Sequence, residues 1–375
     1  MTNNPSPHML SCGGVRENVR EKRCQGGEQR VKDMDFCVGE LARGRRNQIT
    51  DVEGVRVGHA TIDEGDVHTG VTVIMPSMDN PFFRKLPCAC HVLNGFGKSA
   101  GLVQIEELGQ LETPIALTNT LNVGLVWDAM CSYMLKRCRD EGREVRSINP
   151  VVMECNDSYL SDISRRAVRE EHVLSAIREA SEDFLEGAIG CGRGMSCHGL
   201  KGGVGSASRV VKMQGETFTF GAFVLTNHGR LHDLTIQGKP VGREIEQAER
   251  ASSGPDVGSC IMILATDAPL SSRQLQRVIR RMQVGTIRLG SFIGHGSGEI
   301  MLGFSTCNRY DPETDGDVIA GRFLNESRMD LCFRAAAECT EEAVLHSLFQ
   351  AQTLEGRDSH VRHALSEYLD LKREI

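Results

Sequence analysis

Short apolar runs alternate along the chain with segments in which apolar residues recur at helical spacing. The runs at 71–75, 218–225, 261–266 and 300–304 have the composition of buried strands. Apolar residues three or four positions apart predict helices around 125–134, 173–184 and 275–282. Ser271 or Ser272 is expected to cap the last helix, which should end near Gly290. This alternation predicts a layered α/β fold.

The pair Gly258-Ser259 lies just before the apolar run 261–266. The turn-rich stretch 251–257 before it should be exposed. Because glycine has no Cβ, the Gly258 carbonyl can lie open to attack by the Ser259 hydroxyl. A cut there would free an α-amine on Ser259, which can serve as the base for its own hydroxyl. Taken alone, however, a Gly-Ser pair before a strand favours a simple turn.

Three further polar residues lie at strand ends. Ser297 and Glu299 are two positions apart, so in an extended backbone both side chains point to one face. A carboxylate there can orient or accept a proton through the Ser297 hydroxyl, which would in turn reach Ser259. The same residues fit a tight turn equally well. Asn227 carries an amide donor suited to a developing oxyanion, or it caps the end of its strand.

Glu154 follows the apolar segment 150–153. Its carboxylate could hold the free ammonium group of a substrate through a charge-assisted hydrogen bond. Tyr159 lies a few residues further on, where its phenol could contribute to this site, although core packing is its expected task. The sequence therefore places a candidate substrate-binding carboxylate at the end of another predicted strand.

Several separate motifs occur in one order along the chain. They are Ile49-Thr50-Asp51-Val52-Glu53-Gly54-Val55 with Val57-Gly58-His59, Leu117-Thr118-Asn119-Thr120 with Val123-Gly124, Lys201-Gly202-Gly203-Val204-Gly205 with Ala207-Ser208-Arg209, Ala265-Thr266-Asp267-Ala268-Pro269-Leu270, and Gly296-Ser297-Gly298-Glu299. In these segments, over roughly residues 46–358, the chain resembles the self-processing aminopeptidases of the DmpA type, the P1 or S58 peptidases. That family includes L-aminopeptidase/D-Ala-esterases and β-peptidyl aminopeptidases.

The resemblance implies roles for the residues singled out above. It makes Ser259 the nucleophile of a small subunit 259–375 and Gly258 the last residue of a large subunit 1–258. It also implies that Ser297 and Glu299 complete the catalytic group and that Asn227 helps to stabilise the oxyanion. The implied fold is an αββα four-layer sandwich of the DmpA/ornithine-acetyltransferase type, usually assembled as a homotetramer of cleaved protomers.

The chain departs from the family pattern at two places near the expected substrate site. Relatives commonly carry a tyrosine shortly after the glutamate, whereas Asn156 stands there in this chain. Relatives also carry a smaller polar residue and an acidic one in the loop where this chain has Phe96 and Lys98. Substrate preference is therefore expected to differ from that of characterised relatives.

Composition is typical of a globular enzyme, with 40% hydrophobic and 25% charged residues. The net charge of −7 gives no reason to expect nucleic acid or an acidic membrane as a partner. The 14 cysteines have no repeated spacing, which favours reduced thiols in the cytoplasm, and neither a signal peptide nor a membrane span is expected. Residues 1–45 are polar and predict a flexible extension before a single catalytic domain 46–375.

No metal or organic cofactor is expected. Cys191, Cys197 and His198 lie close together, but they lack the second ligand pair that a sequence-defined zinc site requires. The glycines of 187–205 do not match a phosphate-binding loop. They are expected to pack backbone closely near the active site, which Lys201 could line.

The function predicted is that of an autoprocessing N-terminal serine aminopeptidase or amidase, which releases small N-terminal residues from peptides, amides or esters. One alternative is an acyltransferase of the related ornithine-acetyltransferase fold, but that family uses threonine as nucleophile. The other is a catalytically silent scaffold, which the retained Ser259, Ser297, Glu299 and Asn227 argue against and the departure at Asn156 keeps open.

Overall fold

The computed structural model describes residues 38–249, 257–313 and 315–369 of the 375-residue chain. The loop expected at 251–257 therefore lies outside the described residues except for Val257, as does the first part of the expected extension, residues 1–37. None of the helices within the described ranges is both long and apolar enough to cross a membrane.

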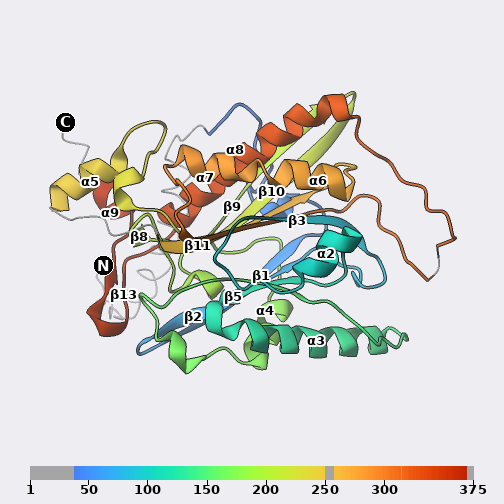
Figure 1. Cartoon of the computed structure of the whole chain (residues 1–375), viewed down its shortest axis with the longest axis horizontal. Coiled ribbons are helices and arrows are strands. Elements are labelled where there is room, and N and C mark those ends of the chain that lie inside the picture. The colour runs from blue at the N-terminus through green and yellow to red at the C-terminus, as the bar shows by residue number, and fades with distance from the viewer. Residues whose placement is uncertain (1–37, 250–256, 314, 370–375) are drawn as a thin grey trace, which may run out of the picture. The chain divides into compact units, whose positions relative to one another are not determined.

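Two β-sheets form the centre of the fold (Figure 1). The smaller sheet has the strand order β1 (Arg56–Glu64), β2 (Val67–Met75), β5 (Ile115–Asn119) and β6 (Val151–Cys155). The larger has the order β4 (Gln110–Leu111), β3 (Leu86–Gly95), β12 (Gly296–Ser305), β11 (Val257–Thr266), β10 (Glu216–Asn227) and β9 (Val204–Met213). Neighbouring strands are antiparallel except for β5–β6 and β11–β12, which are parallel.

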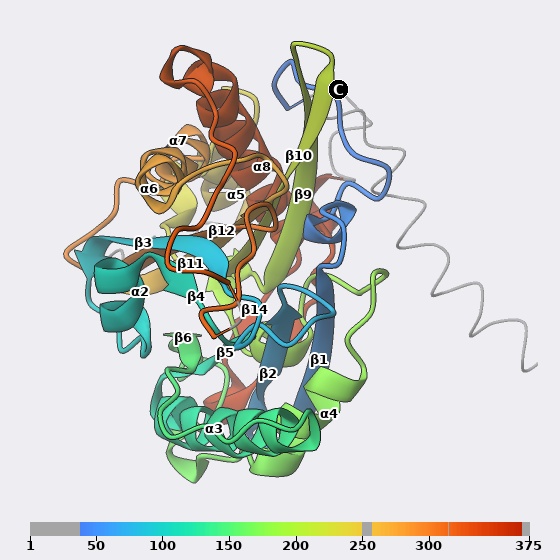
Figure 2. The same cartoon turned by 90° about the vertical axis from the view of Figure 1, so that its right-hand side faces the viewer.

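Helices cover the outer face of each sheet, as Figure 2 shows. Helices α3 (Val123–Asp140) and α4 (Glu170–Arg178) pack on the smaller sheet. Helices α6 (Ser272–Ile279) and α8 (Met329–Phe349) pack on the larger one, and α7 (Met282–Arg288) lies against α8. The helix, sheet, sheet and helix layers confirm the predicted αββα sandwich.

Smaller elements connect these layers. They are α2 (Leu102–Leu108), α5 (Val241–Glu249), α9 (Ser366–Leu369), the strand pair β7 (Ser196–Cys197) and β8 (Leu200–Lys201), the pair β13 (Leu354–Glu355) and β14 (Val361–Arg362), and the 3-10 turns η1 (Ile49–Asp51), η2 (Thr120–Asn122), η3 (Ile163–Arg165), η4 (Gly190–Gly192), η5 (Leu231–Asp233), η6 (Glu326–Arg328) and η7 (Arg357–Ser359). The pair β7–β8 lies beside β10, the strand that ends at Asn227.

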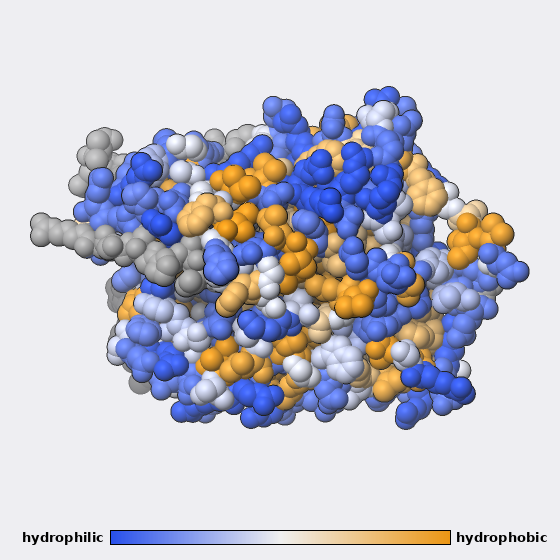
Figure 3. All heavy atoms as spheres, viewed as in Figure 1, coloured by the Kyte–Doolittle hydropathy of each residue, from blue (hydrophilic) through white to orange (hydrophobic). Residues whose placement is uncertain are grey.

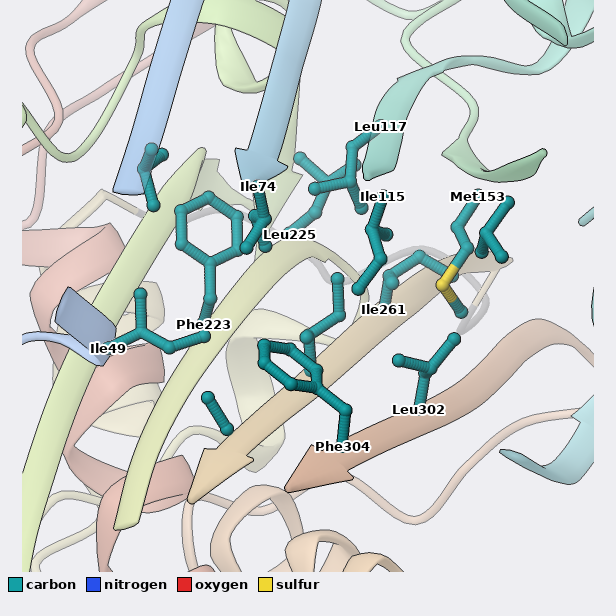
Figure 4. Packing of buried hydrophobic residues seen from close by; sticks show 14 of the residues in the cluster. Ile49, Ile74, Ile115, Leu117, Met153, Phe223, Leu225, Ile261, Leu302 and Phe304 are labelled. Carbon is teal, nitrogen blue, oxygen red and sulfur yellow. The ribbon is translucent and has the colours of Figure 1, made fainter. Parts of the chain in front are cut away.

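The main hydrophobic core lies between the two sheets (Figure 4). From the larger sheet, alternate residues such as Leu225, Ile261 and Leu302 point into it, and Ile115 and Met153 point into it from the smaller sheet. Strand β2 is buried at every position, because one of its faces meets this core and the other meets α3 and α4. Because side chains alternate between the two faces along β11, the same pattern determines on which face Ser259 lies.

The predicted helix after residue 271 begins as expected but is interrupted. Ser271 caps α6 in a capping box with Gln274. The helix then ends at Ile279, and α7 starts at Met282. Helix α7 lies close to α8, where a Cβ on Gly285 would overlap the backbone of Glu341.

The expected boundary of the N-terminal extension at residue 45 needs correction. Residues 38–45, predicted to be flexible, are held against the catalytic domain: Val38 is buried, and the backbone amides of Glu40 and Leu41 donate hydrogen bonds to the Glu338 carboxylate. Ala42 also forms a β-bridge with Val210 at the free edge of β9. These contacts are long-range, so local sequence carries no sign of them.

Candidate active site

The ends of three adjacent strands bring the candidate catalytic residues together. Asn227 at the end of β10 pairs directly with Ser259 near the start of β11. On the other side of β11, Gly258 pairs with Ser297 and Ser259 with Gly298 at the start of β12. Residues from three separate sequence motifs thus become neighbours along one edge of the larger sheet.

Ser259 lies on the face of the sheet that meets the smaller sheet. It shares this face with Ile261 and Ile263, which belong to the core between the sheets, and its side chain is buried. The Ser259 hydroxyl donates a hydrogen bond of 2.6 Å to the carbonyl oxygen of Gly258. The candidate nucleophile therefore lies against the carbonyl group of the peptide bond that the sequence predicts to be cut.

Gly258 is required by packing as well as by the expected reaction. A Cβ at this position would overlap the backbone carbonyl oxygen of Asn227 and would lie 3.2 Å from the Cα of His228. Any larger residue would push β10 away from β11 at the point where Asn227 and Ser259 face each other.

Two backbone groups determine the orientation of the Asn227 amide. Its Oδ1 accepts a hydrogen bond of 3.0 Å from the Ser196 backbone amide. Its Nδ2 donates one of 2.8 Å to the carbonyl oxygen of Asn156. The donor that sequence analysis proposed for an oxyanion is therefore directed towards the segment after Glu154. The Asn156 side chain itself is exposed and caps the following turn by accepting from the Ser158 amide.

Ser297 and Glu299 interact as expected, since the Ser297 hydroxyl donates to the Glu299 carboxylate and both side chains are buried. The expected contact from Ser297 to the Ser259 hydroxyl is not among the hydrogen bonds of the described residues. Side chains alternate along β12, so Gly298 shares the face of Ser259, and a Cβ on Gly298 would lie 3.3 Å from Ser259 Oγ. The pair instead lies on the opposite face, beside Gly258 and Cys260.

Glu154 ends β6 of the smaller sheet and is buried. Its carboxylate accepts a hydrogen bond of 2.9 Å from the Lys98 backbone amide and another from the Thr120 hydroxyl. The Phe96–Lys98 loop also reaches β12, the strand beside the nucleophile strand, because the Phe96 carbonyl oxygen lies where a Cβ on Gly298 would approach to 2.7 Å. This loop therefore connects the candidate ammonium-binding carboxylate with the strand next to Ser259.

The side chains of Phe96 and Lys98 lie against each other. Phe96 is 58% exposed, and the Lys98 ammonium lies 5.0 Å from the centre of its ring. Only the backbone of Lys98 contacts Glu154. Lys98 therefore reaches the candidate site through its backbone, whereas the Phe96 ring is largely exposed.

Several supporting residues of the site carry no signal in the local sequence. Asn94 on β3 donates hydrogen bonds to the carbonyl oxygens of Gly294 and Ser297 and so holds the turn before β12. Thr120 holds Glu154, and Asp157 behind Asn156 accepts from Thr69 and Asn119. Burial raises the pKa of Asp157 to about 7, against the opposing effect of these two donors. Each of these residues depends on a partner distant in sequence.

Lys201, expected to line the active site, is instead completely buried. Its ammonium group donates to the backbone carbonyl oxygens of Gly192, Met195 and Gly202, and burial lowers its pKa well below the usual value. Lys201 therefore holds the glycine-rich segment in shape and does not reach Ser259.

Comparisons with known proteins agree with this geometry. Residues 47–362 match Peptidase family S58. Two curated relatives, each a beta-peptidyl aminopeptidase BapA, come from Sphingosinicella microcystinivorans and Sphingosinicella xenopeptidilytica; each is 36% identical, over 84% of this chain and 84% of its own.

Solved structures extend the similarity to the whole fold. A Burkholderia sp. beta-aminopeptidase superimposes with a TM-score of 0.83 at 37% identity, over 92% of this chain and 98% of its own. The L-aminopeptidase D-Ala-esterase/amidase of Ochrobactrum anthropi, described as a prototype of the serine aminopeptidases and a variant of the Ntn (N-terminal nucleophile) hydrolase fold, gives 0.82 at 34%, over 88% and 94%. A protein of Pyrococcus horikoshii OT3 gives 0.86 at 46%, over 92% and 98%.

Matches to the family and to its curated members thus coincide with a serine at a strand end in an Ntn-hydrolase fold. The chain belongs to peptidase family S58 and is a serine-type aminopeptidase of the Ntn-hydrolase type.

Proposed function

We propose that this peptidase activates itself by cutting between Gly258 and Ser259. The observation that carries the proposal is the 2.6 Å contact between the Ser259 hydroxyl and the Gly258 carbonyl oxygen. Ser259 Oγ attacks the Gly258 carbonyl carbon, the bond to the Ser259 nitrogen breaks, and an ester with a free amine remains. Water then hydrolyses the ester, which gives a Gly258 carboxylate and an N-terminal Ser259.

The mature enzyme repeats the attack on its substrate. The Ser259 α-amine takes the hydroxyl proton, Oγ forms an acyl-enzyme with the residue to be released, and water frees that residue. Asn227 Nδ2 donates to the developing oxyanion. Its amide is already oriented by Ser196, so little reorganisation is required.

The Ser297–Glu299 pair has a different role in this proposal from the one that spacing suggested. Its side chains lie beside Gly258 rather than beside the Ser259 hydroxyl. The pair would act on the nearby peptide nitrogen that becomes the α-amine, which it would orient and whose proton it would share. A buried serine held by a buried carboxylate suits that task.

Substrates are proposed to be peptides, amides or esters with a small N-terminal residue. Glu154 would hold their ammonium group, while Asn156 and Phe96 border the site and influence which residue fits. The relatives described as beta-peptidyl aminopeptidases make β-residues candidates beside α-residues. The exposed ring of Phe96 favours small, apolar neighbours of the released residue.

We also propose that the cleaved enzyme is a cytoplasmic homotetramer. Every cysteine in the described part of the chain is free, as expected in a reducing compartment. Figure 3 shows hydrophobic residues gathered on the face that carries β3 and α2 in Figure 1, where Val92, Val103 and Leu108 are exposed. An apolar area of this kind favours association of protomers.

Intact-mass analysis of the wild type, Ser259→Ala and Cys260→Ala tests the proposal, followed by assays with aminoacyl p-nitroanilides of α- and β-residues. Fragments split between residues 258 and 259 are expected in the wild type and in Cys260→Ala, whose side chain faces away from Ser259, but not in Ser259→Ala. Activity should follow the split. The proposed self-cleavage would be contradicted by a wild type that is active without being cut, or by cleavage of Ser259→Ala between residues 258 and 259.

A further inference from the structure

A second cluster of reactive side chains lies next to the backbone segments that carry Ser196 and Asn227. It consists of Cys197 at the end of β7, His198 directly after it, and His228 directly after β10. One potential ligand atom from each residue lies within 4.8 Å of the other two, and all three residues are buried. We call these residues the Cys197–His228 cluster.

Its three donors are a thiol and two imidazoles, the groups that zinc prefers. In a tetrahedral zinc site such donors lie roughly 3.5 Å apart, given Zn–N and Zn–S bonds of about 2.1 and 2.3 Å. Small rotations of the side chains would draw the three atoms from their present spacing to that separation. The cluster thus has the composition and nearly the dimensions of a three-ligand site.

His228 supplies an independent sign that a ligand belongs here. Its ring is almost wholly buried, yet neither Nδ1 nor Nε2 has a hydrogen-bond partner among the described residues. Buried polar groups in proteins are nearly always paired, so an unpaired buried imidazole calls for a partner. The ring is T-shaped to that of His198, with centroids 5.4 Å apart, and therefore lies within reach of the other donors.

The backbone around the cluster is adapted to this arrangement. His198 adopts a left-handed conformation with φ of 48°, which is uncommon for a residue with a side chain. Gly229 lies so close to it that a Cβ there would approach the His198 ring to 2.5 Å. His198 Nδ1 lies 3.1 Å from the Arg230 carbonyl oxygen. A backbone carbonyl that accepts from one ring nitrogen is the usual support for a metal-binding histidine, whose other nitrogen faces the ion.

We propose that Cys197, His198 and His228 bind a zinc ion that positions the active site without taking part in the reaction. On binding, the Cys197 thiol loses its proton to solvent and the two imidazoles coordinate in their neutral form. A fourth position would be completed by water or another donor. The proposal runs against the expectation from sequence that no metal is bound, because the third ligand, His228, is distant in sequence from the other two.

Charges near the cluster are compatible with a cation. Lys201 is a basic side chain close enough to act on the Cys197 thiol, but its ammonium group is directed at three backbone carbonyl oxygens.

The consequence for the enzyme concerns Asn227. Ser196, which precedes Cys197, donates to Asn227 Oδ1, and Asn227 itself precedes His228. A zinc ion bridging Cys197 and His228 would therefore tie together the two backbone segments that orient this amide. Loss of the zinc ion should make the Asn227 amide more mobile, and should lower kcat more than it raises KM.

The first experiment measures metal in the full chain after incubation with Zn²⁺ and dialysis. About one zinc per chain is expected for the wild type and for the control Cys191→Ser, whose thiol is also buried but contacts Thr72 Oγ1 at 3.2 Å. Cys197→Ser should bind zinc roughly 100-fold more weakly than the wild type. Loss of a metal ligand should reduce affinity at least as much as loss of a residue that only supports a ligand. Equal zinc contents in the wild type and Cys197→Ser would overturn the proposal.

A second measurement remains decisive if the variants do not fold. Co²⁺ added to metal-free wild type should give the sulfur-to-cobalt charge-transfer absorption of a thiolate site, and His228→Gln should lose it. A spectrum identical to that of hydrated Co²⁺ in the folded wild type would refute the site. Neither readout depends on peptidase activity, so the metal proposal and the proposed self-cleavage can fail separately.

Discussion

At the scale of single residues, Gly258 is subject to two demands at once. The predicted cut requires an accessible carbonyl, and the close approach of β10 requires the absence of a Cβ. Ser259 faces a similar combination, because it must be buried on the inner face of β11 while its hydroxyl lies at a peptide carbonyl. Chemistry and packing therefore restrict the same two positions.

Replacing Gly258 by alanine should destabilise the folded chain by about 1–3 kcal/mol, the range typical of an overpacked site. The added methyl group would separate Asn227 from Ser259, so self-cleavage should also be slowed. Thermal unfolding and intact-mass time courses measure the two effects.

The matched control is Gly124→Ala in α3. A Cβ there meets open space, so this variant should be slightly stabilised, by about 0.5–1 kcal/mol. If Gly258→Ala were as stable as this control and were cut at the wild-type rate, the close approach at Gly258 would have no importance.

Glu154 allows a second prediction at this scale. Glu154→Gln keeps the size of the side chain and removes its charge, so it should weaken recognition of a substrate ammonium by about 1.5–3 kcal/mol. The value of kcat/KM for an aminoacyl anilide should fall roughly 10- to 150-fold, with most of the change in KM. Steady-state kinetics of the cleaved variant measures it.

A useful control substrate is the same anilide with its amine acetylated, for which the variant and the wild type should differ little. An equal loss on both substrates would assign Glu154 a structural role instead, through its bonds with Lys98 and Thr120.

At the scale of elements, α8 combines packing with buried charge. It lies across β9 and β10 and carries Glu338 and Glu342, which pair with Arg209 inside the structure. One turn further on, His346 lies 3.2 Å from Glu186 and 3.7 Å from Glu342. Such charges are tolerated in the interior because each faces an opposite one.

His346 should make stability depend on pH. Burial alone would lower its pKa, but Glu186 and Glu342 raise it, and the pKa of the folded state lies above the ordinary value. A raised folded-state pKa stabilises fully below the unfolded value of about 6.5, and the stabilisation is lost as the pH rises through the folded-state pKa. A tenfold gain in proton affinity on folding corresponds to about 1.4 kcal/mol of stability.

Urea unfolding from pH 6 to pH 9 should therefore show a fall in stability that His346→Gln lacks. Arg209 stays charged over this range, because its pKa is raised further above the usual value, so it does not obscure the comparison. Parallel curves for the two proteins would contradict a raised pKa of His346.

At the scale of the whole molecule, the predicted cut would divide the chain without dividing its sheet. Strand β11, which would be cut after its second residue, lies between β10 of the large part and β12 of the small part. Strand β12 in turn pairs with β3 of the large part, and α8 of the small part covers β9 and β10. The two parts are thus interleaved through strand pairs and a helix.

The cleaved parts should therefore remain together as one particle in native mass spectrometry and size-exclusion chromatography, and separate only in denaturant. Uncut Ser259→Ala should elute at the same volume. Dissociation of the parts in native buffer would show that the strand pairs between them contribute little.

Many strands and helices were predictable, because each depends on the spacing of apolar residues within its own segment. The strands at 71–75, 218–225, 261–266 and 300–304 and the helix over 125–134 all occur, since spacing of apolar residues reflects which side faces a core. The break between α6 and α7 has no signal in the spacing of apolar residues. The docking of residues 38–45 was not predictable, because it depends on contact with Glu338 of α8.

The candidate site divides in the same way. The sequence by itself determined the Gly258-Ser259 pair, the shared face of Ser297 and Glu299, and the family motifs, because neighbours along a chain have nearly fixed geometry. Only the tertiary structure decided that Asn227 faces Ser259, that the Ser297–Glu299 pair lies on the opposite face, and that His228 joins Cys197. Those relations depend on strand register, which is set by the packing of two whole sheets and not by any short segment.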